Sequence, residues 1–116
     1  MKAPKDLSRF TKKEMDAVFQ AAFSIHKDEF ITILASRPSI KEYGRALFIT
    51  PKKIGNAPQR NKIRRRIKSI IRENNLYEQK QDVVFIIKSL SSNPSFEKIK
   101  KIVLHAYENK KNNHNI

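Results

Sequence analysis

The sequence predicts one small α+β domain in which helices pack on a single sheet of about four strands. Its 116 residues are enough for one hydrophobic core and leave little room for a second. Apolar residues recur with helical or strand-like spacing in the order helix, strands, helix, strand, helix. With 39% hydrophobic and 31% charged residues, the chain can bury a core. We therefore treat residues 1–116 as one domain.

The first helix is predicted over residues 12–23, because apolar residues there recur along one face. Thr11 and Glu14 have the spacing of a capping box at its start. The residues of the apolar face are Met15, Val18, Phe19, Ala22 and Phe23.

Three strands are predicted from runs of residues that favour extended backbone. The first covers residues 30–35 and is followed by Pro38, and the second covers residues 45–50 and ends before Pro51. The third covers residues 82–88 and contains five consecutive apolar or aromatic residues. Such a run is typical of a strand covered on both faces, which predicts a central position in the sheet.

The two remaining helices follow the second and third strands. Residues 61–74 form one helix, preceded by a loop over residues 52–59, and their buried stripe is Ile63, Ile67, Ile70 and Ile71. The last helix starts at Phe96, with Asn93 or Ser95 as its N-cap. Residues 109–116 are rich in Asn and Lys and are expected to fray.

Composition excludes several classes of protein. There is no cysteine, so disulfide frameworks, thiolate nucleophiles and Cys-based zinc sites are excluded. The longest apolar run, residues 83–87, is far below the roughly 18 residues that span a bilayer. Since the first ten residues also lack the apolar region of a signal peptide, we expect a cytoplasmic protein without a membrane partner.

No catalytic centre made of protein side chains can be assembled from this sequence. His26 is expected in a turn, His105 near the apolar stripe of the last helix and His114 in the tail, without metal-ligand spacing. Asp28 and Glu29 are adjacent, and neighbours on extended backbone point to opposite faces. A glycine-rich phosphate loop is also missing.

Positive charge is the strongest functional signal. The formal net charge is +14, and residues 52–72 hold nine basic residues and no acidic one. In the helix within this segment, Asn61, Arg65, Lys68 and Arg72 lie opposite the isoleucine stripe. Crowded cations without acidic partners repel one another unless a polyanion compensates them, so this helix is predicted to bind nucleic acid.

The same segment carries a dense motif. Its residues are Ile54-x-x-Ala57-x-x-Arg60-Asn61-Lys62-Ile63-Arg64-Arg65-x-Ile67-Lys68. The motif resembles the signature of the bacterial ribonuclease P protein family, small basic subunits that assist a catalytic RNA. The resemblance covers roughly residues 7–108, including Arg9-Phe10, Val18-Phe19 and the late segment that starts with Phe96-Glu97.

The resemblance implies a fold and a function. The fold has a four-stranded sheet and a left-handed β-α-β crossover through the basic helix. The function is that of an accessory subunit of an endoribonuclease that removes the 5′ leader from precursor tRNA, with hydrolysis carried out by the RNA subunit. The implied partners are ribonuclease P RNA and precursor tRNA, with no DNA, and the implied cofactor is magnesium held mainly by the RNA.

Two sets of site residues follow. For the catalytic RNA they are Arg60, Asn61, Lys62, Arg64, Arg65, Lys68 and Arg72. For a cleft that takes the single-stranded leader they are Met15, Phe19, Phe30, Phe48, Lys52 and Lys53. Met15 stands where relatives commonly have an aromatic residue, which weakens the expected stacking there.

Two other classes of protein fit the charge. A small ribosomal or other structural RNA-binding protein has similar size and charge but does not require the Arg60-Asn61-Lys62 motif. A DNA-binding regulator with a helix-turn-helix would need a helix just before the basic one, where we predict a strand and a loop. The RNA that copurifies with the protein would separate these classes.

Overall fold

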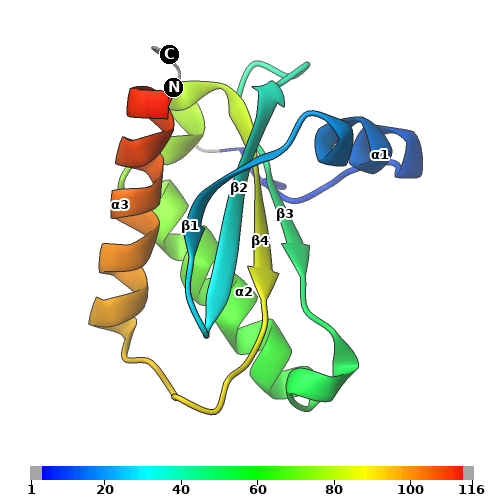
Figure 1. Cartoon of the computed structure of the whole chain (residues 1–116). Coiled ribbons are helices and arrows are strands. Elements are labelled where there is room, and N and C mark those ends of the chain that lie inside the picture. The colour runs from blue at the N-terminus through cyan, green and yellow to red at the C-terminus, as the bar shows by residue number, and fades with distance from the viewer. Residues whose placement is uncertain (1–3, 114–116) are drawn as a thin grey trace.

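The computed structural model contains a four-stranded sheet with helices on both faces (Figure 1). It describes the backbone of residues 4–113 and the side chains of residues 4–109. The strands are β1 (Phe23–Lys27), β2 (Ile31–Pro38), β3 (Ala46–Ile49) and β4 (Gln81–Ile87). The helices are α1 (Lys12–Gln20), α2 (Ala57–Glu73) and α3 (Phe96–Asn113), with 3-10 turns η1 (Lys52–Ile54) and η2 (Leu76–Gln79). The predicted α+β class is confirmed.

The spatial order of the strands is β1-β2-β4-β3, so β4 lies inside the sheet as predicted. The β1–β2 and β2–β4 pairs are antiparallel, whereas β3 and β4 are parallel neighbours joined through α2. In Figure 1 both of these strands point downward, β4 lies to the left of β3, and α2 passes behind them. This crossover is left-handed, against the usual preference and in agreement with the family resemblance.

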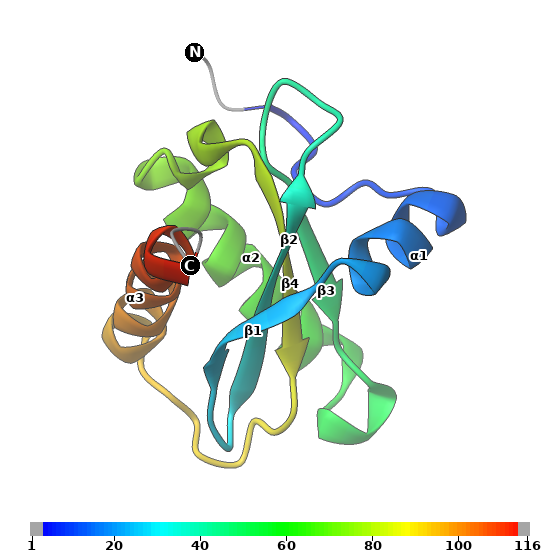
Figure 2. The same cartoon turned by 45° about the horizontal axis from the view of Figure 1, so that its top comes forward.

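Alternation along β3 and β4 divides their side chains between two apolar clusters. One contains Ala46, Val83 and Phe85 together with the buried stripe of α2 and the apolar face of α3. The other contains Leu47 and Val84 together with Val18 of α1. Figure 2 shows α1 apart from α2 and α3. The sheet is therefore covered broadly on one face and only locally on the other.

The first helix is shorter than predicted, and the strand after it was missed. α1 starts with the expected Thr11 and Glu14 capping box but ends at Gln20. Phe23, predicted to lie on the helix, begins β1 and pairs with Ala35. β1 has only five residues, and its register shifts between Ser24 and His26, so its sequence lacks a clean alternation.

The basic helix begins four residues earlier than predicted. Asn56 is its N-cap: its side chain accepts a hydrogen bond from the backbone N–H of Gln59, whose side chain accepts one in return from the N–H of Asn56. Pro58 lies in the first turn, where its missing N–H costs no helical hydrogen bond. The segment predicted as a loop over residues 52–59 is therefore divided between η1 and the start of α2.

The last helix is longer than predicted. Ser95 caps it, since its hydroxyl accepts a hydrogen bond from the N–H of Lys98, whereas Asn93 has the left-handed φ of 43°. α3 continues to Asn113, beyond the expected onset of fraying at Asn109. The rest of the predicted frayed tail, with His114, lies outside the described residues.

Candidate nucleic-acid interface

The predicted division of α2 into a packed face and a basic face is confirmed. Its four buried residues are Ile63, Ile67, Ile70 and Ile71. Asn61, Lys62 and Arg65 are exposed, and the other predicted RNA-contact residues are half-buried: Arg60, Arg64, Lys68 and Arg72. Within residues 4–109, none of these cations forms an ion pair with an acidic side chain. The basic face is thus left with uncompensated positive charge.

Three of the arginines of α2 also donate hydrogen bonds to neighbouring segments of the chain. The guanidinium groups of Arg60 and Arg64 donate to the carbonyl oxygen and the hydroxyl of Thr50, at 3.4 and 3.1 Å. Arg72 donates to the carbonyl oxygen of Lys5 at 3.0 Å. Arg60 and Arg64 therefore lie against the end of β3, whereas Arg65 is free to reach outward.

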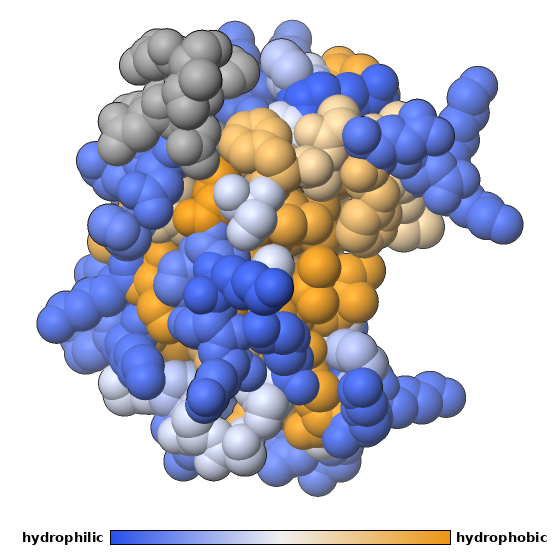
Figure 3. Space-filling view, in the orientation of Figure 1, coloured by the Kyte–Doolittle hydropathy of each residue, from blue (hydrophilic) through white to orange (hydrophobic). Residues whose placement is uncertain are grey.

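A recess with an apolar floor lies between α1 and the sheet. Met15 packs on the α1-side cluster, and Phe19, one turn later on the same face of the helix, is 42% exposed. The floor is formed by the half-buried side chains of Leu34, Ile49 and Ile86. Figure 3 shows this hollow below α1, with apolar side chains at its base. The recess offers apolar surface to a ligand without unfolding the sheet.

Two aromatic residues that were predicted to line this recess face the other way. Phe30 is 5% exposed in the core on the α2 side. Phe48 packs on the same side. Its ring is stacked on the ring of Phe85, with 5.3 Å between the centroids, and Lys68 Nζ lies 5.9 Å from the centroid of the Phe48 ring. The prediction for Phe48 was wrong because β3 is apolar on both faces, so aromatic character did not show which face a ring would occupy. The prediction for Phe30 was wrong because this residue directly precedes β2 and its ring is buried in the main core.

The floor residues Leu34, Ile49 and Ile86 were missed in the sequence. Their signal was the strand period: each lies one position away from a residue of the main core. Arg45 was also missed, because the sequence indicates for it only the first position of a strand. Its guanidinium is buried between Glu14 of α1 and Asp82 of β4.

Lys52 and Lys53 lie at the border between the two surfaces. Both are exposed in η1, directly after β3 and before the basic helix. β3 is an edge strand, so this border faces solvent. The two lysines therefore place positive charge at this solvent-facing edge.

Comparison with known proteins decides the family. The family model described as "Ribonuclease P" matches residues 4–111, nearly the whole chain. The chain belongs to the ribonuclease P protein family. A curated ribonuclease P protein component from Bacillus pumilus (strain SAFR-032) is 30% identical over 96 residues, covering 82% of this chain and 80% of the relative. The corresponding protein of Bacillus velezensis is 29% identical over 104 residues, covering 89% of each chain.

Solved structures of ribonuclease P proteins have the same fold. The Staphylococcus aureus protein superimposes with a TM-score of 0.74 at 17% identity, covering 90% of this chain and 94% of that one. The Thermotoga maritima protein has a TM-score of 0.68 at 22% identity, covering 84% and 91%. This chain is therefore the accessory protein subunit of the ribonuclease P ribonucleoprotein, an endoribonuclease of tRNA processing, and its partner is a ribonuclease P RNA.

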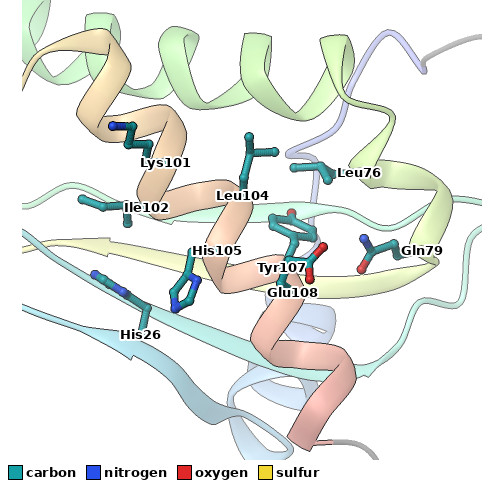
Figure 4. A pocket seen from close by; sticks show the side chains of 9 residues that line it. All are labelled: His26, Leu76, Gln79, Lys101, Ile102, Leu104, His105, Tyr107 and Glu108. Atoms are coloured by element: carbon teal, nitrogen blue, oxygen red, sulfur yellow. The ribbon is translucent and has the colours of Figure 1, made fainter.

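One cavity of this ribonuclease P protein is separate from both surfaces. It has a volume of about 660 Å³ and is lined by β1, η2 and α3 (Figure 4). His26 and His105 line it, but His26 lies in β1 rather than in a turn and bonds Asp28 at 2.7 Å. No cluster of three or more metal-ligating side chains occurs in the described part of the chain. None of its helices there has the length and apolar character needed to cross a bilayer.

Proposed function

We propose that α2 binds the catalytic RNA of ribonuclease P while the recess below α1 holds the single-stranded 5′ leader of precursor tRNA. The residues for the catalytic RNA are Arg60, Asn61, Lys62, Arg64, Arg65, Lys68 and Arg72. The residues for the leader are Met15, Phe19, Leu34, Ile49, Lys52, Lys53 and Ile86. Phe30 and Phe48 are excluded from this second set because they face α2.

The observation that carries this proposal is the placement of the two surfaces on opposite faces of one sheet. The basic face of α2 lies on the side of the main core, and the apolar recess lies on the side of α1. Two RNA segments can therefore contact the protein together without competing. The exposed lysines of η1, at the edge between the faces, supply charge where the two segments approach each other.

Each surface has the chemistry that its RNA requires. Arginine guanidinium and lysine ammonium groups bind the phosphates of a folded RNA. The affinity of the protein for the RNA then depends strongly on the salt concentration. Unpaired bases have apolar faces, and stacking on an exposed ring such as that of Phe19 is worth about 1 to 3 kcal/mol per base. The protein thereby adds affinity for a substrate with a leader, and bond cleavage is left to the RNA.

Magnesium belongs, in this proposal, mainly to the RNA subunit. The side chains at hand do not form a carboxylate cage, since the described residues hold no cluster of three metal-ligating groups. The protein's part is to lower the magnesium concentration that the ribonucleoprotein requires, by contributing cations of its own near the RNA phosphates.

The test is cleavage of precursor tRNA by a bacterial ribonuclease P RNA at low magnesium, with and without this protein. We expect strong stimulation by the protein and no cleavage by the protein alone. A folded protein that binds the RNA yet gives no stimulation would overturn the proposal and favour a structural RNA-binding role, such as that of a ribosomal protein.

A further inference from the structure

The helix that borders the recess has little apolar contact with the sheet. Val18 is the only fully buried residue of α1, and it packs on Leu47 and Val84. α2, by comparison, buries four isoleucines in the main core. Polar contacts at the two ends of α1 must therefore contribute strongly to holding this helix in position on the sheet.

Arg45 makes the contact at the start of α1. Its side chain is 1% exposed, and Nη1 donates to Glu14 Oε2 at 2.9 Å and to the carbonyl oxygen of Arg9 at 3.2 Å. On its other side, Nη2 and Nε donate to the two carboxylate oxygens of Asp82, at 3.0 and 3.3 Å. The guanidinium carbon also lies 4.1 Å from the ring centroid of Phe10. One planar group thus joins β4, the segment before α1, and α1 itself.

Ser36 makes the contact at the other end. Its buried hydroxyl donates to the carbonyl oxygen of Val18 at 2.6 Å, close to the last turn of α1. Ser36 lies in β2 and Arg45 lies directly before β3, and each residue contacts α1 near one of its ends. Because a guanidinium fork has a fixed shape, the contact at Arg45 sets an orientation as well as a distance.

We infer that Arg45, through Glu14, is a positioning residue that latches α1 over the open face of the sheet and so sets the width of the leader recess. This inference rests on the proposed function of the recess. Replacing a buried ion pair by apolar residues is often neutral or stabilising, whereas the planar fork of an arginine holds its partners in a defined orientation. Glu14 joins Arg45 to α1 and Asp82 joins it to β4, so removal of Glu14 leaves the pair of Arg45 with Asp82 and the α2 surface in place.

The test compares three variants in the assembled ribonucleoprotein. Glu14→Ala removes the carboxylate that Arg45 holds. Glu14→Gln keeps one acceptor oxygen, which can serve the backbone N–H of Thr11 or Arg45 but not both. The matched control is Asp16→Asn, since Asp16 is an exposed acid on the same helix and has no hydrogen bond or ion pair within the described residues.

Two quantities are measured: the ratio of affinities for precursor and mature tRNA, and amide hydrogen exchange in α1 and α2. We expect Glu14→Ala to lower the affinity ratio roughly fivefold or more, Glu14→Gln to lower it less, and Asp16→Asn to leave it nearly unchanged. Exchange should accelerate in α1 and not in α2, and affinity for mature tRNA should stay the same.

Each other outcome overturns the inference. Faster exchange in α1 with an unchanged affinity ratio would mean that the recess does not depend on the latch. Equal losses for precursor and mature tRNA, with faster exchange throughout, would make Arg45 and Glu14 elements of stability only. A wild-type ribonucleoprotein that shows no preference for precursor over mature tRNA would instead refute the proposed leader recess itself.

Discussion

The two faces of the sheet are built on different principles. On the α2 side, two helices and the sheet form one continuous apolar cluster, and the charge lies on the outward face of α2. On the α1 side, a short helix covers only part of the sheet and is tied to it by Arg45 and Ser36. The first face derives its order from apolar packing, and the second leaves apolar surface uncovered.

This difference separates stability from binding. Apolar area buried on the α2 side drives folding. The floor of the recess on the α1 side stays partly exposed to solvent after folding, so its apolar surface is available to bind a ligand. A substitution on the first face should therefore alter the free energy of unfolding. A substitution on the second should alter chiefly what the protein binds.

The largest difference in the free energy of unfolding is expected when an isoleucine is truncated to alanine on each face of the sheet. Ile67 of α2 is 0% exposed, so Ile67→Ala should lower the free energy of unfolding by about 3 kcal/mol through lost burial and a cavity. Ile49 on the open face is half-buried, and Ile49→Ala should cost about 1 kcal/mol. Urea unfolding of both variants measures the difference. Equal losses would mean that the two faces contribute alike to stability.

The sequence was sufficient to predict the α2 side. The spacing of Ile63, Ile67, Ile70 and Ile71 matched a helical stripe, and residues 60–72 hold seven basic residues and no acidic one. Burial and charge there follow one period, so the packed and exposed faces could be assigned without a structure.

The α1 side could not be predicted to the same depth, for physical reasons. In β3 and β4 both faces are apolar, so nothing local distinguishes Phe48, which faces α2, from Ile49, which faces α1. β1 is short and its register shifts, so its sequence does not show a strand pattern and Phe23 was assigned to the preceding helix. Arg45 forms ion pairs with Glu14, which is 31 positions away in the sequence, and with Asp82, which is 37 positions away. Only the assembled sheet brings these residues together.

The next effect concerns the exposed ring beside the recess. Phe19→Ala should lower affinity for precursor tRNA roughly 5- to 150-fold, since it removes about 1 to 3 kcal/mol of base stacking. Because the ring is already exposed, folding should change little. The measurement is binding of precursor and mature tRNA by the ribonucleoprotein, and a loss common to both would point to damage of the fold.

A smaller effect is expected on the basic face. Arg65 is exposed and has no ion pair within the described residues, so Arg65→Ala should remove one phosphate contact with the catalytic RNA. The slope of log affinity against log salt should then fall by about 0.7 to 0.9. Lys12→Ala, on the exposed start of α1, is the matched control and should leave the slope unchanged. Equal slopes for wild type and Arg65→Ala would place the RNA elsewhere.

The smallest effect is the acid sensitivity of the α1 contact. The backbone hydrogen bond from Thr11, aided by the hydrogen bond and charge of Arg45, lowers the pKa of Glu14 from 4.5 to about 2 despite an opposing effect of burial. A lowered pKa means that the unfolded state binds the proton first. The stability that Glu14 contributes is therefore complete above about pH 4.5 and is lost as the pH falls toward 2.

Glu14→Gln should remove this part of the acid dependence, so its unfolding free energy should fall less than that of the wild type between pH 4.5 and 2. Asp28, whose pKa is also lowered, is present in both proteins and cancels in their difference. Urea unfolding across this pH range, at constant salt, supplies the comparison. Parallel curves would show that Glu14 is not held as a carboxylate by its partners, and α1 would then need another explanation for its place above the sheet.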